Sequence, residues 1–269
     1  MKLIYNLKLA ALGLLLGTTA CSQAEEEVEA IVKNEVSQEA LQKIYDMGFG
    51  TSDVKAVEGG YLVEGDIMLT DEELDSPHDP KFLRVGETEQ YRTTNLVSAG
   101  TGRTIKVAIS STLPSAYVTA LDEAIRRYNA ENLLIKFQRV SSGYNILLSK
   151  APANASYLAS AGFPSGGNPY NKILVNSSYL GTNPGTNYLG TILAHEMGHC
   201  IGFRHTDYMD RSFSCGGAYT NEGASTVGAV HIPGTPTTAD ATSWMLACVA
   251  SGQNRPFNSN DKTALNYLY

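Results

Sequence analysis

The spacing of apolar and polar positions divides the chain into a short N-terminal part and a longer second part. Residues 28–45 carry apolar side chains loosely at helical spacing. Residues 61–69 form a strand-like run in which Gly65 predicts a bulge or kink. Residues 71–102 are polar and contain several Pro and Gly residues, which is typical of a linker. We therefore expect an N-terminal segment, a linker and a main domain.

In the second part, strand and helix patterns follow one another. Ile105, Val107 and Ile109 alternate with polar or small residues and predict a first strand, and Pro114 then starts a helix that reaches residue 132. Further strands are predicted at 133–140, 144–149, 157–161 and 172–176, with a second helix at 191–200. This order predicts an α/β (α+β) domain with helices packed on a twisted sheet.

Regular pattern nearly disappears after residue 205. Residues 212–242 are rich in Gly, Ser, Thr and Pro, which predicts an irregular C-terminal subdomain. Asn258 and Asp261 supply N-capping signals for a final helix through Leu265 and Leu268.

Composition restricts the class of protein. A hydrophobic content of 43% and a charged content of 17% over 269 residues are those of a globular protein. The net charge of −7 and the lack of a Lys/Arg-rich run argue against nucleic acid as a partner.

The first twenty residues have the features of a targeting signal. Lys2 and Lys8 precede or flank an apolar run at 9–16, and Cys21 follows a stretch of small residues. This resembles a bacterial lipoprotein signal, although Thr18 stands where leucine is usual. We predict a signal peptide at 1–20 and lipidation of Cys21; an ordinary secretory signal cut near Ala20 is the alternative. Both imply export, and in the first case a lipid anchor is the only membrane contact. We expect a monomer.

Export permits disulfides, and three cysteines remain after Cys21. We predict a Cys215–Cys248 disulfide, which would join the loop after residue 205 to the segment after Met245. Cys200 in place of either partner stays open as an alternative.

One stretch, residues 195–205, carries three of the five histidines. His195 and His199 are four apart and project from one helix face, at a spacing that suits a shared zinc ion. Glu196 lies beside such a metal and would take a proton from a metal-bound water. Gly202 allows the chain to turn, so that His205 returns to the same ion.

This run, continued by Thr206-Asp207, resembles that of the bacterial dual-action HEIGH metallo-peptidases, which are metzincin zinc metallopeptidases. His231-Ile232-Pro233-Gly234-Thr235-Pro236 and Ser243-Trp244-Met245 carry the resemblance further. Met197 replaces the isoleucine of the family name. The resemblance implies a mixed five-stranded sheet with two long helices, one catalytic Zn2+ held by three histidines, and protein or peptide substrates. It also implies that Met245 forms a Met-turn beneath the zinc, and that His231 borders the substrate pocket.

Gly65-Asp66 is similar to the end of a propeptide motif of astacin-type metzincins, in which aspartate occupies the zinc of the latent enzyme. Val63 stands where that motif has phenylalanine. One hypothesis is that residues 22–95 form a propeptide with Asp66 as inhibitory ligand, ahead of a catalytic domain at 96–269. The alternative is an N-terminal module in which Asp66 is a turn residue of a hairpin. Arg84, Arg92 and Arg103 are candidate processing sites.

Two other functions compete with the endopeptidase. One is a surface-anchored binding lipoprotein with a structural zinc and no catalysis, although such a site needs no carboxylate at Glu196. The other is a zinc hydrolase of non-peptide substrates, which the motif does not exclude.

Overall fold

The computed structural model describes residues 36–47, 49–75, 90–222 and 229–269. The predicted signal peptide, Cys21 and the linker residues 76–89, with Arg84, lie outside these ranges. Residues Val36–Tyr269 form one unit. Within the described residues, every helix is too short or too polar to span a bilayer.

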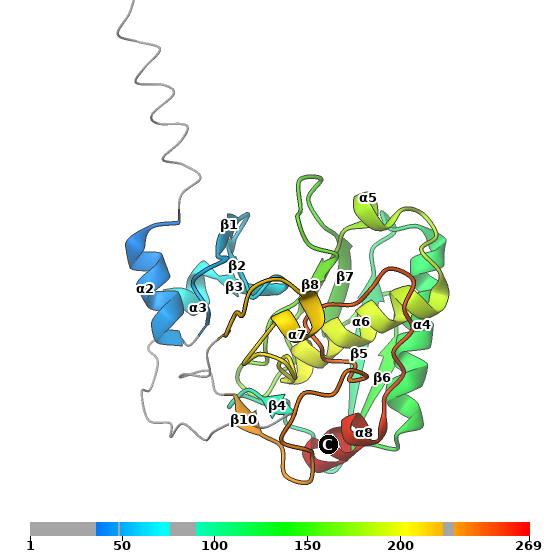
Figure 1. Ribbon diagram of the computed structural model, residues 1–269. Helices are drawn as coiled ribbons and strands as arrows, with labels where there is room; N and C mark the ends of the chain where they lie inside the picture. Colours follow the sequence, from blue (N-terminus) through cyan, green and yellow to red (C-terminus); the bar gives the residue numbers. More distant parts are fainter. Residues whose placement is uncertain (1–35, 48, 76–89, 223–228) are drawn as a thin grey trace, which may run out of the picture. The chain divides into compact units, whose positions relative to one another are not determined.

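A mixed five-stranded sheet forms the centre of the fold, as predicted (Figure 1). Its strands are β5 (Arg103–Ile109), β6 (Ile135–Arg139), β7 (Ile146–Lys150), β8 (Ala159–Ser160) and β9 (Lys172–Val175), in the order β6-β5-β7-β9-β8. Four strands are parallel, and β8 at the edge runs antiparallel to β9. Ile105 and Val107 are fully buried, whereas Lys106 between them is exposed, which is the alternation that predicts β5.

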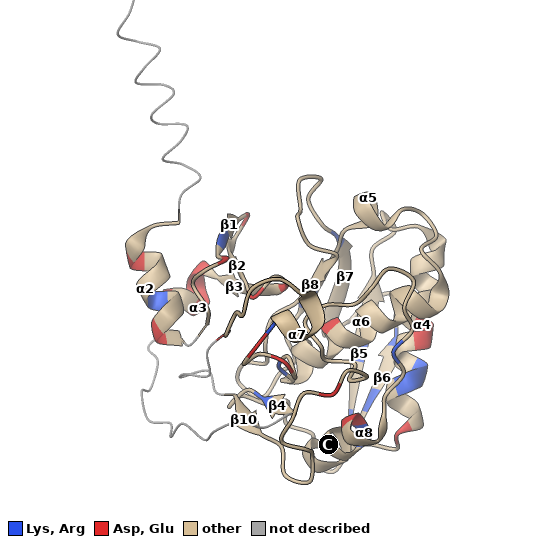
Figure 2. Cartoon of the chain, in the orientation of Figure 1, with Lys and Arg blue, Asp and Glu red and all other residues tan. Residues whose placement is uncertain are grey.

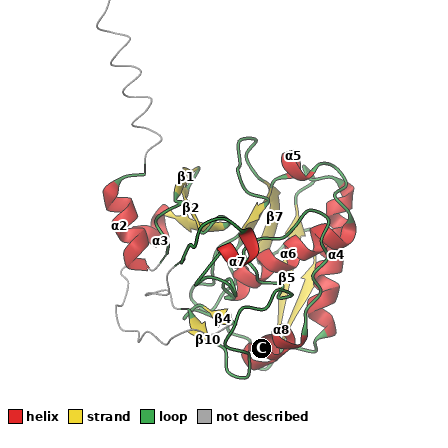
Figure 3. Cartoon of the chain, in the orientation of Figure 1, coloured by secondary structure: helices red, strands yellow, loops and turns green. Residues whose placement is uncertain are grey.

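Two long helices pack against each other beside the sheet, α4 (Ser115–Ala130) and α6 (Thr186–Ile201) (Figure 3). The buried face of α4 includes Leu121 and Tyr128, and its charged positions appear in Figure 2. Helix α6 begins five residues before the predicted start at residue 191. In the structure, Gly190 allows close approach to α4, and Tyr188 and Leu189 are buried.

The N-terminal part comprises α2 (Gln38–Met47), β1 (Lys55–Val57), β2 (Gly60–Val63), β3 (Ile67–Thr70) and α3 (Asp71–Asp75). The prediction of a single kinked strand at 61–69 is wrong, and the hairpin of the alternative interpretation forms instead: β2 and β3 are antiparallel, and Val63 pairs with Ile67. Glu64 has φ of 53° and Gly65 has φ of 90°, so both lie in the left-handed region and the chain reverses at 64–66.

The C-terminal part is irregular, as predicted. It contains α7 (Ser212–Cys215), β10 (Val230–His231) and α8 (Ser259–Leu268), and a further short helix, α5 (Ser177–Leu180), precedes α6. Strand β10 pairs with β4 (Tyr91–Arg92), and the Thr93 N–H donates to the Gly202 carbonyl at 2.8 Å. Residues 90–95 therefore belong structurally with the C-terminal part, although the boundary predicted at residue 95 assigns them to the N-terminal segment.

Asp261 joins three segments that are distant in sequence. Its fully buried carboxylate accepts hydrogen bonds from the Gln90 side chain at 2.8 Å, from Ser243 Oγ at 2.9 Å and from the Trp244 N–H at 3.2 Å. It also accepts from the Asn258 N–H at 2.9 Å, which completes the capping box of α8. This one side chain connects the start of β4, the segment around Trp244 and the final helix.

We predict that Asp261→Ala lowers the free energy of unfolding by about 3 kcal/mol or more, because it leaves several buried donors unpaired. Urea denaturation followed by circular dichroism measures the change. Asp261→Asn keeps the shape of the side chain and should lower the free energy of unfolding by a smaller amount. The exposed neighbour serves as control, since Lys262→Ala should change stability by about 0.5 kcal/mol or less. Equal stabilities of Asp261→Ala and Lys262→Ala would contradict the role of this carboxylate.

Candidate metal centre and active site

Helix α6 presents two histidines and then ends where the chain must turn back. Gly202 caps the helix with φ of 110° and ψ of 10°, and its N–H donates to the carbonyls of Gly198 and His199. The left-handed conformation reverses the chain at little steric cost. His205 is thereby brought to the face of α6 that carries His195 and His199, as the sequence predicts.

The Nε2 atoms of the three histidines converge on one point together with the Asp66 carboxylate. His195 Nε2 lies 3.0 Å from His199 Nε2, and Asp66 Oδ2 lies 3.3 Å from His195 Nε2 and 3.2 Å from His205 Nε2. Four donors bound tetrahedrally to zinc at its usual bond lengths lie about 3.3 Å apart. The observed spacing thus matches a zinc site.

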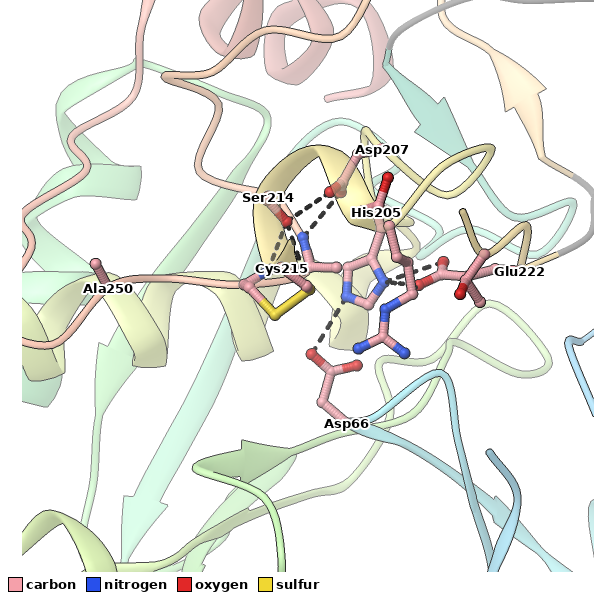
Figure 4. The surroundings of a disulfide bond; sticks show 12 residues. Asp66, His205, Asp207, Ser214, Cys215, Glu222 and Ala250 are labelled. Atoms are coloured by element: carbon pink, nitrogen blue, oxygen red, sulfur yellow. Dashed lines mark hydrogen bonds and ion pairs between the residues drawn. A yellow bond between two sulfur atoms is a disulfide. The ribbon is translucent and has the colours of Figure 1, made fainter. Parts of the chain in front are cut away.

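The other ring nitrogen of each histidine has an oxygen acceptor. His195 Nδ1 lies 2.9 Å from the Trp244 carbonyl, and His199 Nδ1 lies 2.8 Å from the Phe203 carbonyl. His205 Nδ1 lies 3.0 Å from Glu222 Oε1. Figure 4 shows His205 between Glu222 and Asp66.

These contacts fix the chemistry of the donor set. A carbonyl accepts but cannot donate, so the Nδ1 atoms that face Trp244 and Phe203 carry the proton, and the corresponding Nε2 atoms present lone pairs. Converging lone pairs and a carboxylate repel one another unless a cation lies between them. The residues therefore fit a divalent metal, and their second nitrogens have the hydrogen bonds typical of metal-bound histidine.

Electrostatics around the site also favour a cation. Burial acts to lower the pKa of His205, but the negative charges of Asp66 and Glu222 outweigh it and raise this pKa well above its usual range. A position that favours a proton on this imidazole also favours a metal ion in place of that proton.

Glu196 lies beside the histidines and is buried. Burial, followed by the negative charge of Asp66, raises the pKa of its carboxyl well above the usual range. None of the described residues donates a hydrogen bond to its Oε2 atom. The carboxylate faces a cleft of about 220 Å³, which His195, Asp66 and Tyr157 also line.

Met245 is fully buried against α6. A Cβ atom added to Gly198 would lie 2.6 Å from Met245 Sδ, so the glycine leaves the space that this side chain fills. The Met245 carbonyl accepts from the Thr206 N–H at 2.9 Å. The segment around Met245 is therefore attached both to the helix and to the chain after His205.

A disulfide joins Cys215 to Cys248, and Cys200 is a buried free thiol. Figure 4 shows how the disulfide is connected to the site. Ser214 donates to Asp207 Oδ2 and accepts from the Cys248 N–H, while Asp207 Oδ1 accepts from the Ala247 N–H at 2.9 Å. The loop after His205 and the segment after Met245 are thus fastened together.

Several residues of the site have no motif in the sequence. Glu222 and Asp240 are the two acidic residues in the otherwise uncharged stretch 212–242. This isolation is the one sequence feature that could have marked Glu222 as a site residue. Arg204 and Glu64 form an ion pair at 2.7 Å in which both side chains are buried. The expectation that His231 borders the substrate pocket is not met, because His231 contacts Tyr91 and Thr235 and does not line the cleft.

The three histidines, the buried Glu196 and the cleft define a metal-dependent hydrolase site. A family model described as dual-action HEIGH metallo-peptidase matches residues 61–269, which are 209 of the 269 residues. The chain belongs to this family and is a zinc metallopeptidase.

Two solved structures of low sequence identity are similar to the chain. Myroilysin has a TM-score of 0.39 and 12% identity, covering 63% of this chain and 81% of that one. High choriolytic enzyme 1, a hatching enzyme zinc-protease of the medaka fish Oryzias latipes, has a TM-score of 0.38 and 16% identity, covering 65% and 98%. No curated protein sequence matches the chain significantly.

We predict that Glu222→Gln weakens zinc binding by about 10- to 100-fold, because the carboxylate orients the His205 ring and increases its basicity. Competition with a chromophoric chelator measures the affinity. Asp240→Asn, which changes the other acidic residue of the same stretch, is the control and should leave the affinity unchanged. Equal affinities of Glu222→Gln and the unmodified protein would contradict the role given to Glu222.

Proposed function

We propose that the chain is a zinc-dependent metalloendopeptidase in which His195, His199 and His205 hold one zinc ion and Glu196 is the general base. The observation that carries this proposal is the convergence of three Nε2 atoms beside a buried carboxylate that faces a cleft. Family membership supplies the reaction class, peptide-bond hydrolysis.

When bound, zinc would acidify the attacking water and polarise the scissile carbonyl. Glu196 accepts the proton of that water and passes it to the leaving amine. Burial raises the pKa of its carboxyl and makes it a stronger base than an exposed glutamate. The carbonyls of Trp244 and Phe203 hold two imidazoles in orientation. The edge strand β8 offers backbone groups to an extended peptide, with little demand on its sequence.

A binding lipoprotein with a structural zinc would have its site closed by its own fold. Here a cleft opens beside Glu196, and a structural site has no need of a buried carboxylate at that place. Both features favour the enzyme. A hydrolase of non-peptide substrates is less well supported, because an edge strand beside the cleft suits a peptide backbone.

We predict that Glu196→Gln lowers the rate of peptide hydrolysis by at least about 10²-fold while zinc stays bound, because only the proton acceptor is lost. Cleavage of a denatured protein substrate and zinc content are measured together, with and without a chelator. Exposed Glu58 provides the matched control, and Glu58→Gln should cleave normally. Undiminished cleavage by Glu196→Gln would refute its role as base. Bound zinc without cleavage by any form would favour the binding lipoprotein.

We also propose that the hairpin keeps the full-length chain latent through Asp66. Burial alone would raise the pKa of Asp66, but its contacts with His205, His195 and His199 outweigh burial and hold this pKa well below its usual range, so the side chain is an anion. The backbone of the hairpin also forms hydrogen bonds beside the site. The Ala161 N–H donates to the Asp66 carbonyl at 3.0 Å, and the Met68 N–H donates to the Ala161 carbonyl at 2.9 Å. The hairpin thus occupies the backbone of the edge where a substrate would bind.

A second contact fixes the same hairpin. Both carboxylate oxygens of Glu64 lie within 2.8 Å of one Arg204 nitrogen, and the Arg204 guanidinium also lies over the rings of Phe49 and Tyr208. Breaking a buried ion pair by removing one partner costs several kcal/mol. Release of the hairpin must therefore compensate for the loss of this pair.

The position of β4 restricts where such a propeptide would be cut. A cut after Arg92 or Arg103 would detach strand β4, which pairs with β10, and the second would also shorten β5. We propose that the mature N-terminus lies upstream of Gln90. The proposed lipid anchor at Cys21, the export of the protein and its monomeric state rest on the sequence alone.

We predict that Asp66→Ala shortens the lag before the full-length chain becomes active, because the anion no longer competes at the histidines. Release of a fluorescent peptide by freshly purified protein measures the lag. Asp53→Ala, an exposed aspartate of the same part of the chain, is the control. An unchanged lag in Asp66→Ala would support the alternative, in which Asp66 is only a turn residue.

A further inference from the structure

The wall of the cleft beside Glu196 contains a buried arginine, Arg255, which the mechanism above does not use. Its side chain lines the cleft, although the residue is only 9% exposed. One guanidinium nitrogen, Nη1, donates to the Cys248 carbonyl at 2.8 Å. No described residue accepts a hydrogen bond from its Nε atom.

Arg255 differs from the other arginines that are buried in the described part of the chain. Arg127 has Glu123 at 2.9 Å, and Arg204 has Glu64 at 2.7 Å. Among the described residues, no carboxylate forms an ion pair with Arg255. A buried charge without a counter-charge is costly, so folded proteins seldom retain one without a compensating role.

The guanidinium remains a cation in this position. Burial lowers the pKa of Arg255, and the more distant charges of Asp207 and Asp261 act in the opposite direction. An arginine side chain stays protonated at neutral pH even so. Arg211 lines the same cleft, but Glu222 already neutralises it at 3.1 Å. Arg255 is therefore the cation in this wall that has no carboxylate partner among the described residues.

Arg255 shares the cleft with the candidate chemical groups. Ile192, Leu246 and Val249 line the same cleft, as do His195 and Glu196. A substrate side chain that enters the cleft meets apolar side chains and a planar group whose Nε has no hydrogen-bond partner among the described residues. A carboxylate suits that position, because it supplies the missing charge and accepts from a guanidinium with good geometry.

We propose that Arg255 makes the peptidase prefer substrates with an Asp or Glu side chain in one of the two residues that flank the scissile bond. The proposal rests on the proposed function and adds a substrate class to it. An acidic substrate side chain pairs with the guanidinium and offsets the free-energy cost of burying its charge. The substrate with the acidic side chain therefore binds more tightly than the one with the neutral amide. We expect a preference of roughly 10- to 100-fold for Glu over Gln in matched peptides.

The competing explanation is that Arg255 only braces the loop 248–255 through the Cys248 carbonyl. In that case its substitution would change stability and the rate for all peptides alike. Selectivity between acidic and neutral peptides would not change, so selectivity separates the two explanations.

The experiment uses the full-length chain after activation by limited trypsin digestion, with zinc bound. A peptide library is cleaved and the new ends are sequenced by mass spectrometry. The ratio of kcat/KM for a Glu peptide and its Gln counterpart is then measured for the unmodified protein, Arg255→Gln, Arg255→Lys and Arg255→Glu. Arg126→Gln, an exposed arginine on α4, is the matched control. Thermal unfolding and zinc content identify variants that fail to fold.

The expected result is enrichment of Asp and Glu at one flanking position, a Glu/Gln ratio that falls to near one in Arg255→Gln, and its retention in Arg255→Lys and Arg126→Gln. Arg255→Glu should prefer lysine at that position, which a merely structural residue would not produce. Neutral selectivity in the unmodified protein, or selectivity unchanged in Arg255→Gln, would overturn the proposal.

A binding measurement separates this proposal from the proposed function. Fluorescence anisotropy of uncut Glu and Gln peptides is followed with activated Glu196→Gln, alone and combined with Arg255→Gln. Tighter binding of the Glu peptide that disappears in the double variant supports the role of Arg255 even if no peptide is hydrolysed. Equal binding of both peptides to Glu196→Gln counts against it, whether or not the unmodified protein is active.

Discussion

The convergence of three imidazole rings and one carboxylate on a single point is the constraint on which the rest of the structure depends. A single histidine at this place would be unremarkable, but three that face one another need a cation between them, and each must be held from behind by an acceptor. The acceptors come from three separate segments: Phe203 just after α6, Glu222 in the irregular loop, and Trp244 near Met245. Glu222, which lies outside the helices and strands, thus supplies the one carboxylate among these acceptors.

Charge compensation explains much of the surrounding architecture. Arg204 is satisfied by Glu64, Arg211 by Glu222, and Asp66 by the histidines. Two of these three arrangements use residues of the β2–β3 hairpin. The hairpin is thus part of the electrostatic balance of the site and not simply a cover above it. Departure of the hairpin would remove the charge of Glu64 from Arg204, whereas Glu222 would stay close to it.

The sequence was informative wherever short-range rules decide the outcome. The spacing of His195, His199 and His205 with Gly202 fixed the histidine cluster, and alternation around Val107 located β5 correctly. It was less informative where tertiary contacts decide. Residue 191 was predicted as the start of α6, yet close packing on α4 extends the helix to Thr186. A kinked strand and a hairpin both stayed open at 61–69, because the reversal depends on Glu64 adopting a left-handed conformation that its residue type does not indicate. Glu222 and Arg255 act across long sequence separations, so no local pattern identifies them.

The arrangement of the imidazole acceptors has a thermodynamic consequence. Since three distant segments must be in place before the nitrogens can converge, metal affinity and folding of the C-terminal half are linked, and each strengthens the other. The stability of this region then depends on the concentration of free zinc around the protein. A chain that meets little zinc keeps a loosened C-terminal half, which proteases attack first. Zinc binding would thus stabilise the folded C-terminal half, in addition to its part in the reaction.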